Sequence, residues 1–120
     1  MKTLLDPRHK KREKIVKSLY EFGFGKAKLI SPEIKAIMDN HKSIDKLISQ
    51  YAPEWPVENV NRIDLAILRL AIFELTIEKK NPVKVVIDEA VELAKQYGAQ
   101  NSAKFINGVL GSILEKINAT

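Results

Sequence analysis

The sequence contains no cysteine, which excludes disulfides and thiolate metal sites. Its two histidines, His9 and His41, lie in polar surroundings without the spacing of metal ligands, so we expect no metal site. No apolar run approaches the roughly 20 residues that cross a membrane. The start of the chain also lacks the apolar core of a secretion signal, because Asp6 and Pro7 interrupt it. These absences predict a cytoplasmic protein that does not enter membranes.

Motifs for catalysis and nucleotide binding are missing as well. The glycine-containing segment 23–26 is too short for a P-loop, and no strand pattern precedes it. The acidic residues within 88–92 lie beside Lys84 and Lys95 at helical spacing, which is typical of a solvated face with local ion pairs. We therefore expect no enzyme, no cofactor and no small-molecule substrate.

Positive charge is concentrated at the start of the chain. Residues 1–17 carry seven Lys/Arg and two Asp/Glu, a net charge of +5 that equals the net charge of the whole chain. Charge localised in this way indicates a polyanionic partner, with RNA or DNA as the first candidate. The alternative is a solvated helix end. Five basic side chains within residues 8–14 suit phosphate contacts: Arg8, Lys10, Lys11, Arg12 and Lys14.

The hydrophobic pattern predicts a single all-α domain over residues 1–120. Apolar residues recur at helical spacing, and no segment alternates as a strand would. Helices are expected over 7–22, from 32 with a break around 40–43, from 82 to 97 and from 102 to near the end. The segment Asn61–Lys79 is apolar nearly all round, so we expect it to be the central helix.

The first helix changes character along its length. Its apolar stripe of Ile15, Val16 and Leu19 continues backwards to Arg12 and Arg8. This pattern predicts that the N-terminal half of the helix is basic and overhangs the core. Within the central helix, the charged side chains at positions 69 and 74 are expected to have structural ion-pair roles, because buried charges need partners.

Phe105 is a candidate binding residue on the last helix. It lies about 100° away from the apolar stripe that contains Ile106, on a face of small and polar side chains. One interpretation is a surface platform for an unpaired base, with Lys104, Asn101 and Ser102 nearby as polar contacts. The other is packing against the end of a neighbouring helix.

Three segments, 61–75, 81–95 and 102–110, closely resemble the NusB family of bacterial transcription antitermination factors. Arg12-Glu13 and Leu19-Tyr20 resemble the first helix of that family. The resemblance is strong over residues 43–117 and weak over 8–22. It implies an all-helical fold in which two small bundles pack together around the central helix Asn61–Lys79.

The resemblance also implies a non-enzymatic function. Members bind boxA-type single-stranded RNA together with NusE, a ribosomal protein, within an RNA polymerase antitermination complex that supports rRNA transcription. Tyr20 and Asp64 occupy positions that face NusE in the family. The implied RNA-binding residues lie in two stretches: Arg8, Lys10, Lys11 and Arg12, then Asn101, Ser102, Lys104 and Phe105.

Three departures from the family pattern stand out. Position 101 is Asn where the family often has Asp. His9 and the lysines replace part of an arginine-rich run, which removes some bidentate geometry. Only about 40 residues separate Tyr20 from Arg62, so the N-terminal bundle is expected to be reduced.

Two alternative functions stay open from the sequence. One is an accessory helical domain of the kind fused to RNA cytosine methyltransferases, which predicts a catalytic domain beyond Thr120. The other is a protein-interaction scaffold with a degenerate RNA surface, against which the basic start of the chain argues.

Overall fold

The computed structural model describes residues 6–23, 30–52 and 57–119, and these contain helices and no strand. Most of the glycine-containing segment 23–26 lies outside the described residues. None of the described helices is long and apolar enough to cross a membrane. The elements, in order, are α1 (Pro7–Phe22), α2 (Pro32–Asp39), α3 (His41–Tyr51), the short 3-10 helix η1 (Val57–Asn59), α4 (Arg62–Phe73), the π-helix η2 (Glu74–Glu78), α5 (Val83–Tyr97) and α6 (Ser102–Ala119). The predicted all-α class is confirmed.

Local capping explains where the helices begin. The Asp6 side chain accepts a hydrogen bond from the Arg8 amide at 2.8 Å, and Pro7 follows as the first helical residue. Ser31 accepts in the same way from Ile34 at 3.2 Å at the start of α2. The predicted starts of both helices are confirmed.

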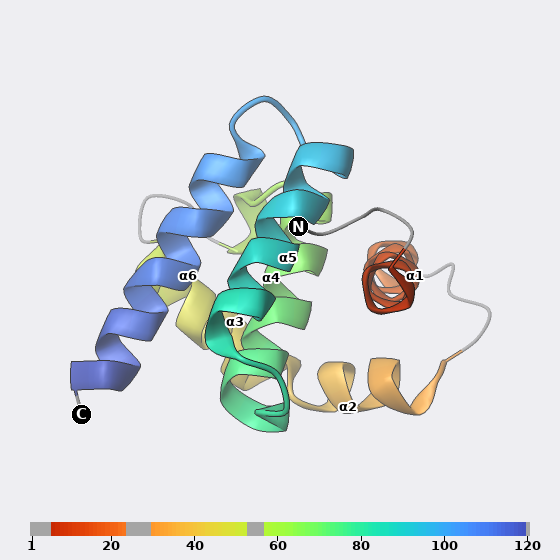
Figure 1. Cartoon of the computed structure of the whole chain (residues 1–120), viewed down its shortest axis with the longest axis horizontal. Coiled ribbons are helices and arrows are strands. Elements are labelled where there is room, and N and C mark those ends of the chain that lie inside the picture. Colours follow the sequence, from red (N-terminus) through yellow and green to blue (C-terminus); the bar gives the residue numbers. More distant parts are fainter. Residues whose placement is uncertain (1–5, 24–29, 53–56, 120) are drawn as a thin grey trace.

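Helix α4 is the centre of the fold, as predicted. It packs against α1, α2, α3, α5 and α6 and lies in the middle of the molecule (Figure 1). A helix apolar on all sides is stable only when other helices surround it. Within the predicted span 61–79, the α-helix ends at Phe73, the π-helix follows, and Lys79 ends it in a left-handed conformation. Seven apolar side chains of α4 are buried: Ala66, Ile67, Leu68, Leu70, Ala71, Ile72 and Phe73.

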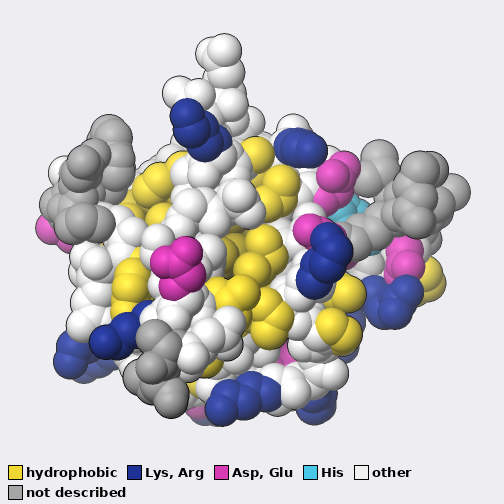
Figure 2. Space-filling view, turned by 60° about the vertical axis from the view of Figure 1, so that its left-hand side comes forward, with side chains coloured by type: hydrophobic (Ala, Val, Ile, Leu, Met, Phe, Trp, Pro, Cys, Tyr) yellow, Lys and Arg dark blue, Asp and Glu magenta, His cyan; other side chains and the backbone are white. Residues whose placement is uncertain are grey.

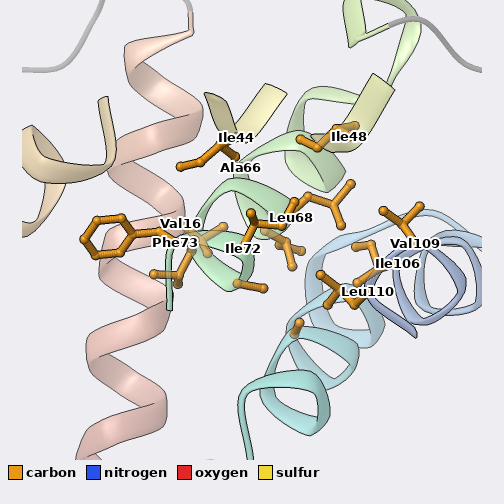
Figure 3. Packing of buried hydrophobic residues seen from close by; sticks show 14 of the residues in the cluster. Val16, Ile44, Ile48, Ala66, Leu68, Ile72, Phe73, Ile106, Val109 and Leu110 are labelled. Carbon is orange, nitrogen blue, oxygen red and sulfur yellow. The ribbon is translucent and has the colours of Figure 1, made fainter. Parts of the chain in front are cut away.

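The core joins two groups of helices across α4. Val16 and Phe73 lie on the side of α1, whereas Ile106 and Leu110 approach from α6 (Figure 3). Burial of a side chain of this size contributes about 1.5–3 kcal/mol to stability. The predicted arrangement of two small groups around a central helix is confirmed. Helices α2 and α3 are short, with eight and 11 residues.

The expectation that the start of α1 overhangs the core is wrong. His9 and Arg12 are only 2% and 8% exposed, although they belong to its basic half. Arg12 continues the stripe of Val16 and Leu19, and that stripe faces inward along most of the helix. Burial extends this far because carboxylates elsewhere in the fold receive the two side chains.

The charged residues of the central segment have the predicted structural roles. Arg69 donates two hydrogen bonds to Asp45 of α3, at 3.0 and 2.8 Å, and this pair is largely buried. Glu74 accepts two hydrogen bonds from Arg12. These pairs attach α3 and α1 to the central segment.

Candidate nucleic-acid interface

Three of the four predicted RNA-binding residues of α1 are exposed. The Arg8 side chain is 80% exposed and donates two hydrogen bonds to the helix cap Asp6, at 3.2 and 3.0 Å. These bonds lower the pKa of Asp6 to about 2. Lys10 is exposed, and the Lys11 ammonium lies 3.4 Å from Glu33 of α2. We call Arg8, Lys10 and Lys11 the basic arm.

Arg12 does not belong to this exposed set, which corrects its predicted placement. Its guanidinium donates to both carboxylate oxygens of Glu74, at 2.9 and 2.8 Å, and to Glu89 Oε1 at 3.3 Å. The bonds to Glu74 raise the pKa of Arg12 further above its already high value. Its charge is compensated inside the protein, so Arg12 offers little to a phosphate.

The π-helix η2 places Glu74 for this contact. Glu74 is its first residue, it is 6% exposed, and its Oε1 also accepts a hydrogen bond from Asn81 at 3.1 Å. Single π-turns within helices are rare and are often found at functional sites. Here the π-turn carries Glu74, whose carboxylate accepts hydrogen bonds from Arg12 and Asn81.

His9 lies next to Arg12 and is buried, contrary to its polar sequence context. Its Nδ1 is 3.1 Å from Glu89 Oε1, and its Nε2 is 2.7 Å from Gln96 Oε1. Glu89 itself is 3% exposed. The prediction of a solvated acidic face on α5 therefore fails at Glu89, although Lys84 and Asp88 form the expected exposed pair at 3.2 Å.

A groove of about 920 Å³ lies between Arg8 of the basic arm and α6, and neither Lys10 nor Lys11 lines it. Arg8 lines it from α1 and Lys104 lines it from α6. Asp88 and Glu92 of α5 also line it, so the groove is not uniformly positive. On the face that carries α6, the coloured lysine and arginine side chains stand apart around an apolar centre (Figure 2).

The other candidates at and just before the start of α6 line a separate hollow of about 370 Å³. Asn101 is exposed at its edge, whereas Ser102 is only 2% exposed and accepts a hydrogen bond from the Ala99 amide at 2.8 Å. Phe105 is half-buried: it packs against the core cluster and also lines the hollow. Packing therefore accounts for part of the ring, and the role of a platform for an unpaired base stays a prediction. Ser102 is therefore buried and stabilises the turn that precedes α6, and its hydroxyl is not an exposed donor.

Asp64, predicted to face a protein partner, lies in this same hollow. It is 6% exposed, and its Oδ1 has no hydrogen-bond partner. Burial raises the pKa of Asp64, and the Ser102 hydroxyl acts in the opposite direction. Asp64 is thus a buried residue of the contact between α4 and α6, not an exposed one.

Tyr20, the other predicted partner residue, lines a third hollow of about 680 Å³. It is 39% exposed and shares the hollow with Ile63 and Tyr97. The Tyr97 hydroxyl donates to Glu13, and this bond raises the pKa of Tyr97. Three lysines also line this hollow: Lys10, Lys14 and Lys17. The structure does not bring Tyr20 and Asp64 into one hollow.

Sequence reasoning missed the acceptors of the buried side chains of α1. Glu89 and Gln96 were not assigned as partners of α1, because nothing local marks them. A signal did exist for Arg12, since it stands on the apolar stripe of its helix while Glu74 stands in an apolar segment. Two isolated charges of opposite sign on buried faces are candidates for one ion pair.

Comparison with known proteins gives a consistent result. The model of the NusB family matches residues 25–115. Transcription antitermination protein NusB of Roseiflexus castenholzii is 52% identical over 75 residues, which cover 61% of this chain and 53% of that protein. The same-named protein of Dehalococcoides mccartyi is 49% identical over 85 residues, which cover 71% of this chain and 59% of that protein. The chain thus spans about half the length of the curated relatives it matches.

Solved structures agree on the fold. A structure titled as NusB of T. maritima matches with a TM-score of 0.82 at 35% identity, covering 96% of this chain and 93% of that chain. A chain from a structure titled "Crystal Structure of a Plectonemic RNA Supercoil" has the same TM-score at 19% identity. The match covers 97% of this chain and 99% of that chain. This second likeness supports the fold alone.

Proposed function

This chain belongs to the NusB family, and we propose that it is a transcription antitermination factor that binds boxA-type single-stranded RNA together with NusE. The curated relatives carry the name of that activity. The observation that carries the proposal is the groove with Arg8 on α1 and Lys104 on α6, beside a chain start that holds the whole net charge.

In this proposal, phosphates contact the basic arm and Lys104. Lys10 and Lys11 are exposed within about one turn of Arg8, so a strand that runs around the start of α1 would contact all three. Arg12 is retained as a positioning residue, because its charge is already paired with Glu74. The acidic side chains in the groove would repel a backbone that lay deep in it, so we place the strand at its basic edges.

A base would contact the hollow that Phe105 lines. An unpaired base can stack on a half-exposed aromatic ring while a neighbouring amide, here Asn101, contacts its edge. Ser102 would act indirectly by holding the turn before α6 through the Ala99 amide. Positions 101–105 then bind on two sides, with Lys104 toward the groove and Phe105 toward the hollow.

NusE would occupy the hollow that Tyr20 lines. This hollow combines the aromatic rings of Tyr20 and Tyr97 with Ile63, a composition suited to a protein partner. Asp64 would contribute from below the surface, by supporting the start of α4 next to Ile63.

The salt dependence of RNA binding tests the proposal. Four phosphate contacts, from Arg8, Lys10, Lys11 and Lys104, predict a slope of log K against log[salt] of roughly −3, at about −0.7 for each contact on single strands. Lys10→Ala should reduce the slope by about 0.7. Lys46→Ala is the matched control, since this exposed lysine of α3 lines none of the three hollows. A slope near zero would reduce the basic arm to a solvated helix end.

A further inference from the structure

The groove between α5 and α6 has two walls of different character. Its α6 wall carries Lys104 and Asn107, which are exposed and lie one turn apart on the same face of the helix. Its α5 wall carries acidic side chains, among them Glu92. Apolar side chains also line the groove: Val85, Val91 and Ala103. Apolar surface combined with a few polar groups that fix orientation is typical of sites for small organic groups.

Glu92 is the acceptor that the protein itself leaves unused in this groove. It is half-buried, and its carboxylate has no hydrogen bond or ion pair within the described residues. A half-buried carboxylate has lost part of its hydration, so it gains from an N–H donor that a ligand brings. The other acidic side chains that line the groove have partners on the protein. These pairs are Asp6 with Arg8, Asp88 with Lys84, and Glu89 with Arg12.

The chemistry of the α5 wall suits the edge of a base and not a phosphate. A carboxylate accepts hydrogen bonds and repels another anion. Guanine, adenine and cytosine each carry an exocyclic amino group that donates, and acidic side chains accept from such groups. The pairing edge of uracil instead places its single N–H between two carbonyl oxygens, which a carboxylate repels. Asn107 on the opposite wall can both donate and accept, so it fits the ring atoms beside the amino group.

We propose that Glu92 is a specificity-determining residue: a base turned into the groove donates its exocyclic amino group to Glu92, and Asn107 contacts the same base from α6. The inference rests on the proposed function and adds a second base contact to the one at Phe105. The phosphates of the strand stay on Arg8 and Lys104, which line the groove from the other two helices. The acidic wall thus admits amino-bearing bases at this position and disfavours uracil.

The test is a titration of a labelled boxA-type oligonucleotide and of copies that each lack one exocyclic amino group. Inosine, nebularine and zebularine replace guanosine, adenosine and cytidine for this purpose and leave the phosphates unchanged. For one copy we expect wild-type affinity to fall about five- to tenfold, the lower end of what one base contact discriminates. Glu92→Met should bind that copy and the unmodified strand equally, because the acceptor is gone. Glu115→Met is the matched control, since it removes an exposed glutamate of α6 outside the groove and should keep the wild-type discrimination.

Lys104→Ala gives a contrast from the same groove, because loss of a phosphate contact should weaken every copy by the same factor. The inference is overturned if the wild-type protein binds all copies equally, or if every loss of affinity persists in Glu92→Met. If Glu92→Met only strengthens binding of all strands by one factor, the wall merely repels RNA, which would assign it to a basic segment of a protein partner. Absence of binding to the unmodified strand would instead refute the proposed function, and this inference with it.

Discussion

The guanidinium of Arg12 connects glutamates from two different elements, Glu74 of the π-helix and Glu89 of α5. Arg12→Met should lower the free energy of unfolding by about 3–5 kcal/mol, because it leaves carboxylates buried without their cation. Urea unfolding measures this loss. Adding Glu74→Gln to Arg12→Met should recover part of it. Arg8→Met is the control and should lower the free energy of unfolding only slightly, since Arg8 is exposed and pairs with Asp6 at the surface. Equal effects of the two arginine substitutions would contradict the assignment.

Phe105 allows a separate prediction at the residue scale. Phe105→Ala should weaken RNA binding by about 1–3 kcal/mol if a base stacks on the ring. Because the ring is half-buried, the loss of stability should stay below the roughly 3–5 kcal/mol of a fully buried phenylalanine. Ile106→Ala, at a fully buried neighbour, should lower stability by about 2–5 kcal/mol. RNA affinity unchanged by Phe105→Ala would assign the ring to packing alone.

At the scale of the element, the start of α1 depends on the charge of Asp6. Its pKa is lowered to about 2 in the folded protein, mainly by the hydrogen bond from the Arg8 side chain. A carboxyl whose pKa is lowered on folding stabilises the fold above its unfolded value and loses that contribution as pH falls. We therefore expect the Arg8 amide to lose hydrogen-exchange protection between about pH 4 and about pH 2. In Asp6→Ala this pH-dependent loss should be absent, and its persistence would contradict the cap assignment.

Helix boundaries were predictable because their signals are local. Asp6-Pro7 and Ser31-Pro32 each combine a capping side chain with a proline that suits the first turn. The π-helix after Phe73 was not predictable, since residues 74–78 continue the helical pattern. The burial of His9 was not predictable either. Periodicity shows which residues share a helix face, but it cannot show that Glu89 and Gln96 lie opposite that face.

For the whole molecule, the separate hollows predict how binding is divided. The proposed RNA contacts and the hollow of Tyr20 adjoin at Lys10 without sharing their aromatic residues. A partner that also contacts the strand should tighten RNA binding about tenfold or more, equivalent to about 1.4 kcal/mol of coupling. The RNA dissociation constant, measured with and without saturating NusE, checks this. Tyr20→Ala should remove the coupling and leave the affinity of the isolated protein unchanged. Equal constants for the wild-type protein would indicate a stand-alone RNA binder.

The burial of Arg12 also has a consequence for the order in which the protein forms during synthesis. Arg12 precedes Glu74 by 62 residues and Glu89 by 77. At about 5–20 residues per second, Glu89 is added to the nascent chain roughly 4–15 s after Arg12. Until then α1, although it is synthesised before all the other helices, has no carboxylate on α5 to dock against. The basic arm therefore takes its final position late, and an unfinished chain still attached to the ribosome does not yet present the arm as the complete domain does.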